Sequence, residues 1–214
     1  MKSKVLVITS GKGGVGKTTT AINLSATLAS AEKKTLLIDC DAQGNASSGV
    51  GIQRDKCQEK NLYYALINRV PLRDVIMPTC IPYLDVVAAT QDLVGIEVEF
   101  ASLEEREKQL KKLIRELDRE YEFVILDCPP SLGFLTLNAL VASTEILVPI
   151  QTEYYALEGV SHLMRTINKV KGNLNDDLSL STILLTMFDP RTNLSREVAD
   201  EVRRHFPEQT LDVE

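Results

Sequence analysis

The chain has 214 residues, of which 44% are hydrophobic and 25% charged, and its formal net charge is -6. This composition is typical of an ordinary globular protein, and the length fits one domain, residues 1–214, with a continuous core. No apolar run is long enough to cross a bilayer, and the negative charge excludes a surface coated with nucleic acid, though not a local basic patch.

The chain begins with an apolar run, Val5-Leu6-Val7-Ile8, and has no signal-peptide features, so we expect a cytoplasmic protein. Strand-like runs then alternate with helical stretches, which predicts an α/β fold: a mostly parallel sheet with helices on both faces. The expected strands cover residues 4–9, 35–39, 84–88, 123–127, 145–150 and 181–186. The expected helices cover residues 17–30, 103–120, 133–142, 157–171 and 194–205.

The stretch "SGKGGVGKTTT" follows the first strand and matches G-x-x-x-x-G-K-[ST], the loop that cradles a nucleotide's phosphates. Glycines let the backbone N–H groups face an anion, and the following helix adds the positive end of its dipole. Lys17 is expected to reach the outer phosphates and the Thr18 hydroxyl to bind magnesium. The strand before the loop and the helix after it favour a phosphate site over a glycine-rich turn without a ligand. The expected phosphate-binding residues are Gly11, Lys12, Gly13, Gly14, Val15, Gly16, Lys17, Thr18 and Thr19.

Two segments in the middle of the chain carry structural signals. Residues 44–62 are rich in Gly, Ser and Gln without a clear period, which predicts a loop or short turns. In the helix expected at 103–120, Ser102 and Glu105 form a capping box. The apolar face of this helix is expected to consist of Leu103, Leu110, Leu113, Ile114 and Leu117. The expected ion pairs on its other face are Glu104 with Lys108 and Glu107 with Lys111.

Aspartates close two of the expected strands. "FVILDCPPS" places Asp127 at the carboxyl end of one strand, where an acidic residue is expected to hold magnesium through water. "LLIDCDAQGN" places Asp39 and Asp41 at the end of another, on the edge where such sheets bind ligands. One of this pair is expected to orient the attacking water, and the alternative is that both cap a turn.

Other chemistries lack the residues that they need. The two histidines, His162 and His205, lie near no serine or cysteine nucleophile motif, and no G-x-G-x-x-G fingerprint with a ribose acid is present. The four cysteines form no C-x-x-C pair, which argues against zinc and disulfides, although Cys40 and Cys128 are expected to lie close together at their strand ends. Of the reaction classes considered, phosphoryl transfer from a nucleoside triphosphate to water is the one that the sequence supports.

Several stretches resemble the ParA/Soj family of chromosome and plasmid partitioning ATPases, which belongs to the deviant Walker A group of P-loop proteins. The matching stretches are "KGGVGKTTTAINL", "LLIDCDAQGNASSG", "FVILDCPPSLGFLTLNAL", "PIQTEYYALEG" and "LLTMFDPRTNLSREV". They follow the family's order from near the N-terminus to the last expected helix.

The resemblance implies roles for individual residues and a cofactor, ATP with Mg2+. Lys12 would be the signature lysine, which reaches across a dimer interface to the phosphates bound by the other subunit, in the manner of an arginine finger. Lys17 and Thr18 would be the phosphate and magnesium ligands, and Asp127 would hold the magnesium through water. Asp41 would position or activate the hydrolytic water. Together these roles imply a homodimer that forms with ATP.

The resemblance also implies two further partners. Family members bind nonspecific DNA as ATP dimers, and a ParB-type centromere-binding protein stimulates hydrolysis, so the implied location is the cytoplasm at the nucleoid. The expected DNA-binding residues are Arg191, Arg196, Arg203 and Arg204. The alternative is that these arginines only pair with Glu197, Asp200 and Glu201 on the same helix.

The end of the chain departs from the family's pattern. Family chains continue with another strand, a loop with further basic residues and a closing helix, whereas this chain stops at "FPEQTLDVE". We therefore expect an uncovered sheet edge, an intact phosphate site and weakened DNA binding.

Two alternative functions share the phosphate loop. A MinD-like ATPase would reach a membrane through a C-terminal amphipathic helix, but no such helix is expected here, and "QTEYYALEG" and "DPRTNLS" favour partitioning. A noncatalytic module would use ATP only to hold a dimer together. The presence of Lys12, Asp41 and Asp127 argues against that module, since a pure clamp needs no hydrolytic residue.

Overall fold

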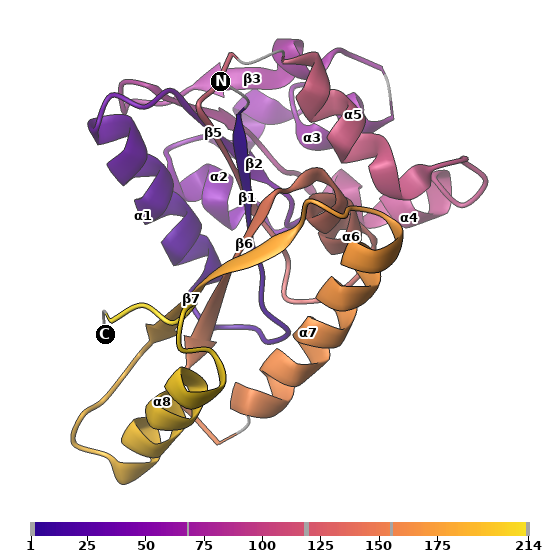
Figure 1. Ribbon diagram of the computed structural model, residues 1–214. Coiled ribbons are helices and arrows are strands. Elements are labelled where there is room, and N and C mark those ends of the chain that lie inside the picture. The colour runs from indigo at the N-terminus through magenta and orange to yellow at the C-terminus, as the bar shows by residue number, and fades with distance from the viewer. Residues whose placement is uncertain (1–2, 68, 118–119, 155, 213–214) are drawn as a thin grey trace.

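The computed structural model describes residues 3–67, 69–117, 120–154 and 156–212, and within these ranges one sheet contains strands in the order β3-β4-β2-β5-β1-β6-β7 (Figure 1). The strands are β1 (Lys4–Ile8), β2 (Thr35–Asp39), β3 (Ile76–Pro78), β4 (Leu84–Val87), β5 (Phe123–Asp127), β6 (Glu145–Gln151) and β7 (Ser179–Thr186). The α-helices are α1 (Lys17–Ser30), α2 (Asn45–Gly49), α3 (Leu62–Leu66), α4 (Ile96–Glu99), α5 (Gln109–Glu116), α6 (Phe134–Ala142), α7 (Ala156–Asn173) and α8 (Asn193–His205). Short 3-10 helices cover Arg54–Cys57, Leu72–Val75, Gln91–Gly95 and Arg106–Lys108.

The sheet is parallel except at β3, which pairs antiparallel with β4. Parallel strands end at the same edge, so the segments after β1, β2, β5, β6 and β7 gather along one side of the molecule. From β1 the chain crosses to β2 on one side of the sheet, and from β5 it later passes β1 to reach β6 and β7 on the other side. This is a topological switch point, the place where open α/β sheets bind their ligands.

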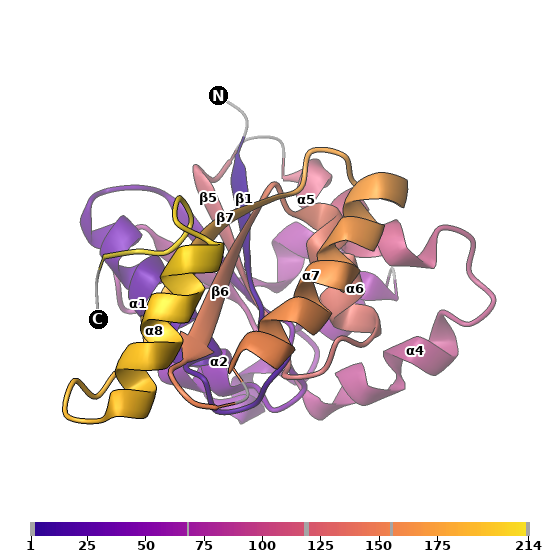
Figure 2. The same cartoon turned by 60° about the horizontal axis from the view of Figure 1, so that its bottom comes forward.

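Helices cover both faces of the sheet, which explains the continuous apolar runs of its strands. Successive strand residues point to opposite faces: Val7 packs with the cluster under α5, α6 and α7, and Ile8 packs with the cluster under α1. Both side chains are fully buried. Figures 1 and 2 show α1 on one side of the sheet and α6 with α7 on the other. Burial on both faces holds the strand ends at a fixed edge.

The predicted fold class is confirmed, and the expected strands agree with the observed ones to within two residues at each end. The helix expected at 103–120 is wrong in its first half, because α5 begins only at Gln109. Glu105 has a left-handed φ of 52° that a continuing helix cannot adopt, and Leu103 is 40% exposed. Glu105 pairs with Lys108 and Lys112 instead of serving as a capping residue for Ser102.

The edge strand β7 is paired along part of its outer side. The Ile183 N–H donates to the Gln209 carbonyl at 2.8 Å, and the Leu211 N–H donates to the Ile183 carbonyl at 3.0 Å. Residues 209–211 thus run parallel to β7 and cover the middle of the edge that was expected to be bare.

Candidate phosphate and magnesium site

The loop between β1 and α1 has the backbone that the glycine pattern predicts. Gly14 and Gly16 have φ angles of 76° and 90°, in a region that side chains with a Cβ rarely adopt. Gly16 directly precedes α1, so the N-terminal N–H groups of this helix open toward the loop. The Thr186 hydroxyl at the end of β7 donates to the Val15 carbonyl at 3.0 Å and ties the loop to the sheet. The backbone of the loop is therefore concave and fixed to the sheet, which suits the binding of an anion.

Lys17 brings a cation into this loop. Its side chain is only 6% exposed, and its Nζ donates to the Lys12 carbonyl at 2.7 Å. Burial lowers the pKa of Lys17, while the nearby Asp127, Cys128 and Asp41 raise it. A buried ammonium that donates to a neutral carbonyl has charge to offer to a ligand.

Asp127 faces the same space from the end of β5. It is fully buried, its carboxylate oxygens make no well-formed hydrogen bond within the described part of the chain, and the neighbouring Thr18 hydroxyl is near enough to lower its pKa. Burial first and the Asp39 carboxylate second raise the pKa of Asp127 to about 7, against the opposing effects of the Thr18 hydroxyl and the Lys17 ammonium. The sheet register explains this effect, since Asp39 and Asp127 are direct neighbours on β2 and β5. Two buried oxygens without a well-formed hydrogen bond fit a hydrated cation at this place.

The structure separates the roles of Asp39 and Asp41. Asp39 is fully buried and accepts hydrogen bonds from the Ser47 N–H (2.8 Å), the Ser47 hydroxyl (2.7 Å) and the Asp41 N–H (3.1 Å). The Ser47 hydroxyl also accepts from the Ala89 N–H after β4, at 3.1 Å. Asp39 therefore fixes the turn after β2. Asp41 is partly exposed, with one oxygen accepting from the Gln43 N–H at 3.0 Å, and it is the member of the pair that can act on a ligand.

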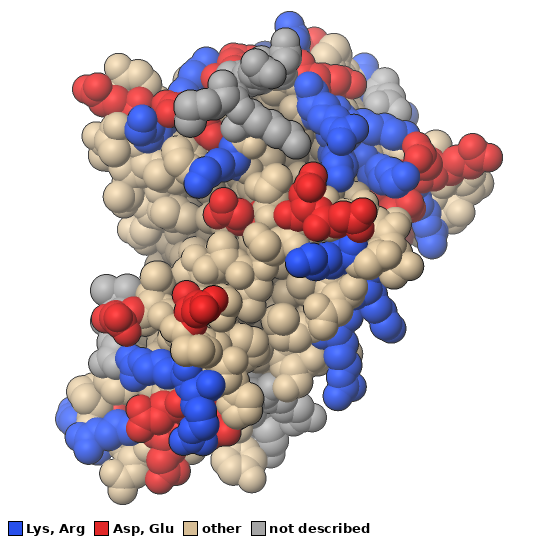
Figure 3. Space-filling view, viewed as in Figure 1, with Lys and Arg blue, Asp and Glu red and all other residues tan. Residues whose placement is uncertain are grey.

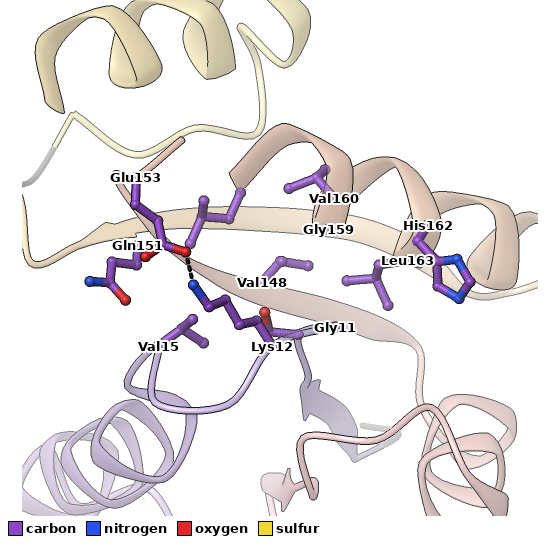
Figure 4. Close-up of a pocket in the computed structure, with 12 residues that line it drawn as sticks. Gly11, Lys12, Val15, Val148, Gln151, Glu153, Gly159, Val160, His162 and Leu163 are labelled. Atoms are coloured by element: carbon purple, nitrogen blue, oxygen red, sulfur yellow. Dashed lines mark ion pairs between the residues drawn. The ribbon is translucent and has the colours of Figure 1, made fainter. Parts of the chain in front are cut away.

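Lys12 is one of the residues that line a cavity of about 320 Å³ beside the loop. Residues from the loop, from β6 and from the start of α7 line this cavity, among them Val15, Val148 and His162. Figure 4 shows the Lys12 side chain pointing toward Glu153, which follows β6, and the two form an ion pair. Lys12 is thus held within its own chain in this structure.

The β7 to α8 connection is tied to the same edge. The Thr152 hydroxyl, just after β6, lies 2.6 Å from the Ser195 hydroxyl in the first turn of α8, and both residues are buried. Ser195 also accepts from the Asp189 N–H at 3.1 Å, and Thr192 caps the helix by accepting from the Ser195 N–H. The start of α8 is therefore fixed to the segment that carries Glu153.

The four arginines expected to bind DNA lie on this connection and on α8. Arg191 is 87% exposed in its side chain and pairs with Asp189 through two nitrogens. Arg203 pairs with Asp200, and Arg204 pairs with Glu201. Arg196 is exposed on the same helix. The local pairing that the alternative predicted is thus present for Arg203 and Arg204, and Figure 3 shows positive and negative side chains mixed over α8.

The remaining observations concern cysteines, metals and membranes. Cys40 and Cys128 are buried, and the hydrogen bond that the Cys40 thiol donates to the Cys128 sulfur is the largest cause of its raised pKa, so the two lie together as expected. Within the described ranges, no group of three or more His, Cys, Asp or Glu side chains is arranged to hold a metal ion. A magnesium ion held mainly by phosphates and water needs no such group. None of the described helices is long and apolar enough to cross a membrane.

Sequence reasoning gave no role to two residues of this edge. Glu153 stands two residues after the end of β6, and the rule that ligands bind at carboxyl strand ends could have singled it out. Ser47 is eight residues from Asp39, and no local pattern indicates that its hydroxyl returns to that carboxylate.

Comparisons with known proteins cover nearly the whole chain. Residues 3–180 match a protein family described as an AAA domain. The chromosome partitioning protein ParA of Myxococcus xanthus is 53% identical over 210 residues, which are 98% of this chain and 74% of that protein. The sporulation initiation inhibitor protein Soj of Bacillus subtilis is 47% identical over 95% of this chain and 80% of its own length. Cobyrinic acid a,c-diamide synthase of Mycobacterium smegmatis, solved with ADP and magnesium, has a TM-score of 0.90 at 36% identity and covers 95% of this chain and 82% of its own.

Proposed function

The chain belongs to the ParA/Soj family of chromosome partitioning ATPases, and on this premise we propose that it hydrolyses ATP with magnesium and dimerises around ATP. The observation that carries the proposal is a buried Lys17 ammonium in a glycine loop beside a fully buried Asp127 carboxyl group that makes no well-formed hydrogen bond. Burying charged groups is costly, and a nucleotide phosphate with its cation would give both groups a strong ligand contact.

The nucleotide phosphates would lie in the loop from Gly11 to Thr19. The backbone N–H groups and the α1 dipole favour negative charge there. Lys17 would exchange the Lys12 carbonyl for a phosphate oxygen, a change that needs only the rotation of a side chain. The solved relative with ADP and magnesium supports this placement through its fold.

Magnesium would be held by the Thr18 hydroxyl and, through water, by Asp127. The ion would neutralise the charge that develops on the phosphates. Asp127 suits this role because a bound cation would give a strong contact to its two buried oxygens, which make no well-formed hydrogen bond among the described residues. Thr18 stands next to Lys17 in the first turn of α1, so phosphate and metal would meet at one helix end.

Asp41 would position the attacking water. Asp39 is unsuitable, because its carboxylate already accepts three hydrogen bonds in a fully buried place. The side chain of Asp41 is partly exposed to solvent at the same edge. A carboxylate there can accept a proton from water during attack.

Two further parts of the function rest on family membership. Lys12 would neutralise the phosphates bound by a second copy, and the arginines Arg191, Arg196, Arg203 and Arg204 would contact DNA phosphates without reading sequence. A ParB-type protein would stimulate hydrolysis. The protein would then work in the cytoplasm, at the nucleoid.

Phosphate release from ATP tests the catalytic part. Wild type is expected to turn over ATP with magnesium and to stop when EDTA removes the metal. Asp41→Ala should keep ATP binding and lower turnover by roughly 10² to 10⁴-fold, the usual contribution of a positioned base. Unchanged turnover in Asp41→Ala would assign the water to another residue, and absence of turnover in wild type would refute the ATPase.

A further inference from the structure

We propose that Glu153 is a positioning residue that holds Lys12 within its own subunit and so sets the ATP concentration at which the dimer forms. The inference deepens the proposed function and rests on it, since it concerns the release of Lys12 toward a second copy. The observation that supports the inference is the ion pair between Lys12 and Glu153 beside the cavity (Figure 4).

The pair is partly withdrawn from water. The side chains of Lys12 and Glu153 are 45% and 29% exposed, and the Oε1 atom of Glu153 is shielded from solvent. Lys12 is the charged partner that the structure gives this oxygen. If Lys12 leaves, a shielded carboxylate oxygen loses its counter-charge, and this loss opposes the departure.

Glu153 is presented from a rigid support. Gln151 still pairs with Thr186 in the sheet, and Thr152 is held by the buried contact with Ser195. The Glu153 N–H donates to the Gln151 carbonyl at 2.9 Å, which closes a tight turn. The carboxylate therefore cannot follow Lys12 far without breaking contacts in β6 or α8.

Lys12 cannot serve both partners. Its backbone is fixed in the loop, where its carbonyl accepts from Lys17, so only its side chain can move. An ammonium directed at Glu153 of its own chain is not available to phosphates across an interface. Dimerisation must therefore break the ion pair, and the phosphates of ATP, with several negative charges, can outcompete one carboxylate.

Removing the carboxylate should consequently favour the dimer. Glu153→Gln keeps the size of the side chain and removes its charge. The matched control is Glu145→Gln, at the opposite end of β6, because Glu145 also pairs with a lysine, Lys4, at 3.6 Å but far from the loop. Both variants lose one negative charge and one ion pair.

The experiment is a titration of magnesium-ATP at fixed protein concentration, with the dimer fraction read by light scattering. Glu153→Gln is expected to lower the midpoint by roughly three- to tenfold, the effect of a partly shielded ion pair. Glu145→Gln should stay within about twofold of wild type. ADP affinity, measured separately, should change little in Glu153→Gln, whereas damage to the loop would weaken ADP binding as well.

An unchanged or higher midpoint in Glu153→Gln overturns the inference, and so does an equal shift in Glu145→Gln. These results leave the proposed function intact if wild type dimerises. If wild type stays monomeric and Glu153→Gln dimerises, the holding role is supported in its strongest form. If neither dimerises with ATP, the proposed dimer fails and the inference fails with it.

Discussion

Charged side chains lie at the edge formed by β1 and β5 and also on the arm formed by β7 and α8. The two regions differ in how far these charges are buried. At the edge, Lys17 and Asp127 are buried, and the Asp127 oxygens make no well-formed hydrogen bond among the described residues. On the arm, Arg191 and Arg204 are exposed and pair with acids a few residues away. Buried charge without a partner is costly and points to a ligand, whereas exposed local pairs contribute little either way.

This contrast shows how far each part of the function is supported by geometry. The proposed nucleotide site is supported by the folded chain itself, because Lys17 and Asp127 are buried side by side at this edge. The DNA contact is supported by family membership and by position, since the arm's ion pairs would have to open. Substitutions at the edge should therefore change function more than substitutions on α8.

Lys17→Ala should have the largest effect. It removes the buried cation from the loop, and we expect ATP affinity to fall by roughly 10²-fold or more, the range for a charge-assisted contact to a phosphate. Lys34→Ala, which breaks an exposed pair with Glu120, is the control and should bind ATP as wild type does. Calorimetric titration measures both. If ATP affinity in Lys17→Ala stays within a few fold of wild type, the phosphates do not bind in this loop.

Asp127→Asn should separate stability from function. The variant replaces a fully buried ionisable group that lies beside the Asp39 carboxylate with a neutral one, so the nucleotide-free protein should unfold about 2–4 °C higher, corresponding to roughly 1 kcal/mol. The same change should abolish the gain in ATP affinity that magnesium provides. Differential scanning calorimetry and ATP titrations with and without magnesium measure the two effects. A lower unfolding temperature together with an unchanged magnesium effect would make Asp127 an ordinary structural residue.

Arg196→Ala should have the smallest effect. If Arg196 contacts one phosphate, the slope of log affinity against log salt should fall by about 1. Arg115→Ala, an exposed arginine on α5, should leave the slope unchanged. Filter binding of duplex DNA at several salt concentrations, with ATP present, gives the slope. Equal slopes in wild type and Arg196→Ala would mean that this side of α8 does not touch DNA.

Much of the edge was predictable, because buried parallel strands give continuous apolar runs and the phosphate loop has a fixed spacing. The β3 strand was missed, since it has three residues, ends in Pro78 and lies at the antiparallel edge. Ser102 failed as a helix cap because Glu105 adopts a left-handed backbone, which a capping pattern does not reveal. The choice between Asp39 and Asp41 depended on Ser47, whose hydroxyl returns to Asp39 only in the folded chain.

ATP is proposed to join two copies of the chain through Lys12. The decisive experiment is light scattering of three samples: wild type with magnesium-ATP, wild type without nucleotide, and Lys12→Ala with magnesium-ATP. We expect a doubled mass for wild type with magnesium-ATP and the mass of one chain in the other two samples. A monomer in all three samples, or a dimer that forms equally well in Lys12→Ala, would rule out this dimer.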